Sequence, residues 1–145
     1  MSARAWVIDT SVSGKEREIN LVLYEDIEEM RADALGFSRG IGEQDIPDDH
    51  YEHAAAVSHA YEMIDEETEE QQPEIGTLRF CADYLDSMIL AHEAVHIAQW
   101  LYRLDVLGGA SVELAVDHFD GGNEVFAHMV SDVFGAVLKT IESAT

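Results

Sequence analysis

The residues best suited to chemistry are His92-Glu93-Ala94-Val95-His96, an H-E-x-x-H motif. Histidines at positions i and i+4 of a helix leave the same face one turn apart, so both imidazoles can reach one metal ion. The glutamate lies at the edge of that face, where it can accept a proton from a metal-bound water. Zinc held in this way lowers the pKa of its water to about 7. The motif predicts a zinc hydrolase or a descendant of one, against the alternative of an ordinary amphipathic helix with two histidines.

A catalytic zinc needs three protein ligands and an open position, so a third ligand must come from elsewhere in the chain. Glu124 is favoured because it begins a helix with an apolar face, 28 residues after His96. Its alternative role is that of a carboxylate stabilised by the helix dipole. His128 could instead be a ligand, a donor to a developing oxyanion, or a partly buried helix histidine. The candidates for the third ligand are Asp117, His118, Asp120, Glu124 and His128, of which His118 and Asp120 could also hydrogen-bond a ligand from the preceding loop.

The motif requires a helix to position it, and the flanking sequence supplies one. A helix is predicted from about Asp86 to Leu104, with Asp86 as its N-cap and Gly108-Gly109 at its end. The apolar run from Ile75 to Phe80 predicts a strand just before it. Strand, short connection and H-E-x-x-H helix is the order in which zinc peptidases present their active site.

The remaining sequence predicts a small α+β domain that spans residues 1–145. Alternation or apolar runs predict strands at 5–8, 19–24 and 57–64, although the alanines from Ala54 onward also favour a helix for the third of these. We expect strand 57–64 to pair with strand 75–80 as a hairpin. Residues 25–35 are predicted as a helix, 36–49 as an irregular loop, 111–118 as a short helix or loop, and a last helix begins after the N-cap Asn123. The expected fold is a mixed or antiparallel sheet of about four strands, packed on the H-E-x-x-H helix and the C-terminal helix.

Composition excludes several classes of protein. The chain has 145 residues, 47% of them hydrophobic, which is enough for one globular domain. It has no apolar run of about 18 residues and no apolar signal-peptide core near Met1, so we expect a cytoplasmic protein without a membrane segment. The single cysteine, Cys81, rules out an internal disulfide and is expected to be a small buried side chain.

The charge of the chain is extreme: 30 acidic residues against 8 basic ones give a formal net charge of −22. Such a chain repels nucleic acids and anionic membranes, so neither is expected as a partner. The acidity could reflect solvation at high salt, mimicry of nucleic-acid phosphates, or acids carried in loops. The first and third explanations are favoured, because the densest acidic block, residues 65–70, is one local run.

The pieces 75–80, 91–98 and 123–128 together resemble the small zincin-like metallopeptidases of bacteriophage genomes, which are similar to a minimal gluzincin core. In gluzincins the two motif histidines and a glutamate on a following helix bind zinc, and the motif glutamate is the general base. The resemblance implies His92, His96 and Glu124 as zinc ligands and Glu93 as the base. Members of the family often carry tyrosine where this chain has His128.

The resemblance also implies that residues 75–80 form the edge strand of the active site, along which a peptide or protein substrate could lie by strand addition. The implied function is zinc-dependent peptide hydrolysis in a host cell's cytoplasm. Two alternatives remain: an acidic interaction protein without catalysis, or a structural zinc closed by a fourth ligand such as His128 or Asp120. The other histidines, His50, His53 and His59, are expected to be surface or strand residues.

Overall fold

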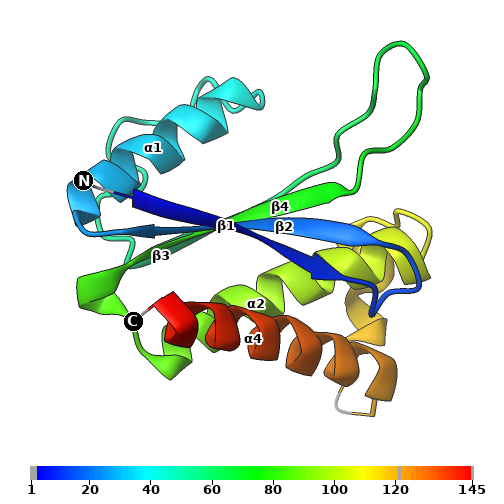
Figure 1. Ribbon diagram of the computed structural model, residues 1–145. Helices are drawn as coiled ribbons and strands as arrows, with labels where there is room; N and C mark the ends of the chain where they lie inside the picture. Colours follow the sequence, from blue (N-terminus) through cyan, green and yellow to red (C-terminus); the bar gives the residue numbers. More distant parts are fainter. Residues whose placement is uncertain (1–2, 121, 145) are drawn as a thin grey trace.

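A computed structural model describes residues 3–120 and 122–144 and has an α+β fold with a four-stranded mixed sheet (Figure 1). The sheet order is β1-β2-β4-β3; β2 and β4 are parallel, and the two outer pairs are antiparallel. No helix among these residues is long and apolar enough to cross a membrane. The strands are β1 (Ala3–Thr10), β2 (Arg17–Tyr24), β3 (Ala56–Ala60) and β4 (Glu74–Cys81); the α-helices are α1 (Ile27–Gly40), α2 (Ser87–Leu101), α3 (Val112–Ala115) and α4 (Glu124–Ala144).

Helices cover the two faces of the sheet unequally. In Figure 1, α2 and α4 lie side by side beneath the sheet and α1 lies above it. The period-two alternation of β2 separates its side chains accordingly: Ile19, Leu21 and Leu23 join the core on the α2 and α4 face, and Tyr24 joins a smaller core with α1. The prediction that the H-E-x-x-H helix and the C-terminal helix pack on the sheet is confirmed.

The expectation that residues 75–80 form an edge strand is wrong. β4 is an inner strand, bonded to β2 on one side and to β3 on the other. Seven of its eight residues are buried, which is typical of a strand covered on both faces and paired along both edges. The predicted hairpin with β4 is correct, and its first strand, β3, is the free edge of the sheet. β3 ends at Ala60, four residues earlier than predicted, and the acidic block 65–70 follows in a loop.

Helix α1 continues to Gly40, five residues beyond the predicted end at Leu35. Buried contacts made by its last turns explain why Gly36 does not stop it. The Phe37 ring lies 4.8 Å from the His59 ring, between centroids. The Ser38 hydroxyl oxygen lies 2.7 Å from His59 Nε2. Tertiary packing therefore outweighs the low helix propensity of glycine at this position.

The helix that carries the motif is fixed at both ends, largely as predicted. The Asp86 carboxylate accepts a hydrogen bond of 2.8 Å from the Ile89 N–H and caps α2. After Leu101 the chain makes one π-helical turn, η2 (Tyr102–Val106), and then leaves through Gly108 and Gly109, at φ 66° and 89°. These left-handed conformations suit glycine because a Cβ atom would be strained there.

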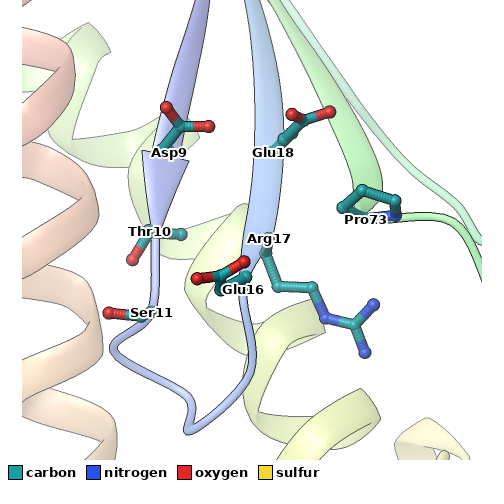
Figure 2. Close-up of a pocket in the computed structure, with 7 residues that line it drawn as sticks. All are labelled: Asp9, Thr10, Ser11, Glu16, Arg17, Glu18 and Pro73. Atoms are coloured by element: carbon teal, nitrogen blue, oxygen red, sulfur yellow. The ribbon is translucent and has the colours of Figure 1, made fainter.

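A buried ion pair ties this end of the helix to the β1–β2 hairpin. Arg17 Nε donates to Asp105 Oδ2 at 3.0 Å, and a second nitrogen of the guanidinium donates to the other carboxylate oxygen. Both side chains are buried. In Figure 2 the Arg17 side chain extends away from the β1–β2 turn. Burial alone would raise the pKa of Asp105, but hydrogen bonds from Arg17 and Ser13 and the charge of Arg17 outweigh burial and hold the pKa below its ordinary value.

We predict that Asp105→Asn lowers the free energy of unfolding by about 3 kcal/mol at pH 7, because it leaves a buried guanidinium without its counter-charge. The pKa of Asp105 is lower in the folded protein than in the unfolded chain. The ionised carboxylate therefore contributes its full stabilisation above the unfolded pKa, near 4, and this stabilisation is lost as the pH falls through the folded-state pKa. The difference between the two proteins should therefore shrink below pH 4 in urea titrations. Asp48→Asn is the control: its ion pair with Arg39 is exposed, so we expect a change below about 1 kcal/mol. Equal effects of the two substitutions would contradict this assignment.

Candidate functional site

The two motif histidines stand together on the exposed side of α2. His92 Nε2 and His96 Nε2 are 3.2 Å apart, and the ring planes meet at 79°. The two rings are within hydrogen-bond distance of each other, and their spacing also matches that of two ligands at 2.0–2.1 Å from one tetrahedral zinc, which are about 3.3 Å apart. Both rings are exposed, so a metal ion can reach them. The histidine pair therefore fits one half of a zinc site.

Glu93 lies at the boundary between this exposed side and the packed side of the helix. Each residue turns the helix by about 100°, which places Glu93 between the histidines and the buried Ala94 and Ile97. Its side chain is only 7% exposed. In the part of the chain that the structure describes, its carboxylate forms no hydrogen bond or ion pair. A largely buried carboxylate next to two exposed histidines on one helix is placed to accept a proton.

A cleft of about 640 Å³ opens beside the histidine pair, between the outer edge of β3 and α2. The Trp100 indole N–H donates to the Tyr61 carbonyl at 3.2 Å and joins the two walls. The Arg103 guanidinium lies 5.3 Å from the Trp100 ring centroid. The cleft is lined by Ser58, Ala60, His96, Gln99, Trp100, Arg103, Val112, Val116 and Phe119.

The wall formed by β3 offers unpaired main-chain groups to this cleft. The Tyr61 N–H donates to the Ile75 carbonyl at 3.0 Å, so Tyr61 and Ile75 form a hydrogen-bonded pair. The preceding residues of β3 pair with β4 in the same register. Main-chain groups of an antiparallel strand point alternately toward and away from the partner strand. The N–H and C=O of Ser58 and Ala60 therefore point toward the open edge. The same two residues line the cleft.

The candidates for the third ligand are not gathered around the histidines. Within residues 3–120 and 122–144, no three His, Cys, Asp or Glu side chains lie close enough to hold one metal ion. α4 packs on α2 through a buried stripe that includes Met129 and Val133. Helical geometry puts Glu124 and His128 on the opposite side of α4, and both are exposed.

The other loop candidates are engaged locally or exposed. The ring of His118 lies near the Tyr102 hydroxyl, at 3.5 Å from Nδ1. The Asp120 carboxylate accepts from the Gly122 N–H within its own turn. Asp117 is exposed, in the short η3 helix (Val116–His118) that follows α3.

The remaining histidines have other surroundings. His50 and His53 are exposed, and His59 is a buried residue of β3 on the α1 face of the sheet. Burial and the charge of Arg79 lower the pKa of His59 to about 4, so this ring is neutral at pH 7. Cys81 is buried, as predicted.

A separate acidic hollow of about 420 Å³ lies by the β1–β2 turn. Asp9 and Glu18 stand opposite each other on the two strands, with Glu16 nearby (Figure 2). The one cation that lines this hollow, Arg17, is already paired with Asp105. This hollow includes none of the motif residues.

Sequence reasoning missed the cleft residues. Trp100 follows His96 by one helical turn, so its i+4 spacing could have marked it as part of the same face. The role of Ser58 and Ala60 depends on which strand is the sheet edge, and strand order has no local sequence signal.

Comparisons with known proteins returned no relative. A scan against protein-family models, a search of curated proteins and a search of solved structures each gave no match.

We predict that the purified protein binds one zinc ion through the histidine pair. His92→Ala and His96→Ala should each weaken zinc binding by about 100-fold or more. Removal of a direct zinc ligand should lower the affinity more than removal of a residue that only hydrogen-bonds a ligand, which lowers it by about 10- to 100-fold. His53→Ala is the matched control, since His53 is exposed and distant from α2 in sequence. The measurement is a competition titration with a zinc chelator at about 0.15 M salt, which screens weak binding to the acidic surface. Equal affinity in the His92 and His53 variants would exclude the proposed site.

Proposed function

We propose that this protein is a zinc-dependent peptidase with a zincin-like active site of the bacteriophage type. The observation that carries the proposal is the 3.2 Å separation of His92 Nε2 and His96 Nε2, which is the spacing of two ligands on one zinc. Two further features support it. Glu93, which lies between the two histidines in the helix, is largely buried. The cleft next to His96 has a free strand edge as one wall.

In this proposal His92 and His96 hold the zinc, and Glu124 is the third ligand. Glu124 is exposed in the first turn of α4, on the side opposite to α2, so its coordination would require that turn to move toward the histidine pair. When bound, zinc supplies a water of lowered pKa and polarises the scissile carbonyl. His128, one turn further along α4 on the same side as Glu124, is proposed to donate to the oxyanion after the same movement.

Glu93 is the proposed general base. Its carboxylate takes the proton of the attacking water and later delivers it to the leaving amine. Enclosure of the side chain restricts competing hydrogen bonds from bulk water and holds the carboxylate in one place. The buried neighbours Ala94 and Ile97 fix the rotation of α2 and hence the direction of Glu93.

The proposed substrate is a peptide that adds to β3, instead of to the strand 75–80 expected from the sequence. The main-chain groups of Ser58 and Ala60 would pair with the peptide backbone. The side chains that line the cleft, among them Trp100 and Phe119, would contact the substrate side chains. The scissile bond would then lie along α2, next to His96.

We predict that Glu93→Gln retains zinc but lowers the rate of peptide hydrolysis by about 100-fold or more, because glutamine cannot accept the proton. The assay uses a fluorogenic peptide library, with zinc content measured on the same samples. Glu113→Gln, an exposed glutamate of α3, is the control and should retain full activity. An acidic interaction protein would show no zinc-dependent hydrolysis, even before substitution, and that result would exclude the enzyme.

We predict that Ser58→Pro weakens substrate binding while the fold and the zinc affinity are preserved. Proline removes a main-chain N–H that points to the open edge, and proline is tolerated on edge strands for this reason. The loss of one backbone hydrogen bond should raise KM by about fivefold, with a smaller change in kcat. Ser58→Ala keeps the N–H and should leave KM unchanged. The strand-addition model is contradicted if both variants behave like the native protein.

A further inference from the structure

A second hollow, of about 350 Å³, lies on the other face of the sheet, beside α1. On this face, residues paired across β1, β2 and β4 form two neighbouring rows. One row is Val7, Asn20 and Thr77, and the other is Ala5, Val22 and Arg79. Phe37 of α1 closes one side of the hollow, and Glu74 also lines it. The helix that carries the histidine pair, α2, lies on the opposite face of the sheet from α1 (Figure 1).

Arg79 is the unusual residue of this hollow. Its side chain is only 8% exposed, and its Nε–H is the only buried side-chain polar group without a hydrogen-bond partner among the described residues. A buried donor without an acceptor costs about 1–3 kcal/mol. Such an orphaned group needs an explanation, and one explanation is an acceptor supplied by a ligand.

The protein does not neutralise Arg79 directly, although the chain carries 30 acidic residues. Nη1 lies 3.2 Å from His59 Nδ1, and the Phe37 ring centroid lies 4.8 Å from the guanidinium carbon. The His59 ring is neutral at pH 7 because burial and the charge of Arg79 lower its pKa to about 4. Because a guanidinium can only donate, Nδ1 of the neutral ring accepts from Arg79, and Nε2–H faces the hydroxyls of Ser38 and Tyr51.

Two nearby carboxylates are engaged elsewhere. Asp33 accepts from the Tyr24 hydroxyl at 2.8 Å, and Glu74 accepts from the Tyr61 hydroxyl at 2.7 Å. Burial and the hydrogen bond to Asp33 raise the pKa of Tyr24 and outweigh the hydrogen bond and charge of Arg79, which lower it, so Tyr24 is a neutral phenol that also contacts Arg79. No ion pair to Arg79 is formed within the described part of the chain.

We propose that this hollow binds a small monoanionic carboxylate with an apolar body. His59 takes Nη1 and the Tyr24 hydroxyl is a further hydrogen-bond partner of the guanidinium, so Nε–H is the donor that is left for an oxygen of a carboxylate. Val7, Val22 and Phe37 provide the apolar wall. Glu74 in the same hollow repels further negative charge on the ligand, which disfavours a multivalent anion such as phosphate.

The test uses phenylacetate as the probe and phenylacetamide as its uncharged match. Binding is followed by calorimetry and by the Arg79 Nε–H signal in ¹H–¹⁵N NMR spectra. We expect saturable binding of phenylacetate, a shift of that signal, and affinity at least about tenfold higher than for phenylacetamide. Equal affinity for the two probes, tighter binding of inorganic phosphate, or an unmoved Arg79 signal would each overturn the proposal.

Two pairs of variants place the probe in the hollow. Val7 is 57% exposed, so substitutions there spare the core. Val7→Glu should lower the affinity for phenylacetate by about tenfold relative to Val7→Gln, because it adds a like charge to the wall. Equal affinities of the two Val7 variants would overturn the assignment.

Arg79→Lys should abolish the preference for the carboxylate, whereas Lys139→Gln, on the exposed side of α4, should not. His92→Ala should bind phenylacetate like the native protein, so this test is independent of the zinc site.

Discussion

Close packing of α2 on the central strand β4 sets the geometry of the whole molecule. Gly76 makes this approach possible: a Cβ atom at that position would lie 2.7 Å from Ile97 Cδ1. With Ile97 seated against the strand, the rotation of α2 is fixed, and Ala94 and Leu101 face the core. The same rotation directs His92 and His96 outward and leaves Glu93 at the boundary. The chemistry of the motif is therefore a consequence of which helix face meets β4.

The C-terminal helix and the β1–β2 hairpin support that arrangement. α4 packs beside α2 on the same face of the sheet through a buried stripe repeated every four residues, from Met129 to Ile141. Arg17 reaches from β2 to Asp105 and holds the turn that follows α2. The chain has only 8 basic residues, and one of them is buried beside Asp105, where it holds the end of the helix that carries the motif. Arg79 differs, since it is buried without such a partner.

The parts of the fold that depend on local pattern could be predicted from the sequence. The period of the apolar residues located all four strands and the long helices, and the side chains of Asp86 and Asn123 correctly marked two helix starts. Strand order could not be predicted, because β4 is placed between β2 and β3 by long-range pairing. The end of α1 was missed for a similar reason: Phe37 and Ser38 continue the helix through contacts with a strand about twenty residues away. For the site, the i, i+4 spacing predicted the histidine pair. It could not place Glu124, whose position depends on how α4 rotates to bury its apolar stripe.

The central claim is that His92 and His96 hold one zinc ion together, and X-ray absorption at the zinc edge tests it most directly. For protein loaded with one equivalent of zinc, the account predicts scattering from two imidazoles, at nitrogen distances of about 2.0–2.1 Å, with oxygen ligands completing a tetrahedral shell. His92→Ala should remove one imidazole from that shell. A shell of oxygen ligands alone would contradict the account, because it would place the zinc on the acidic surface instead of the H-E-x-x-H helix.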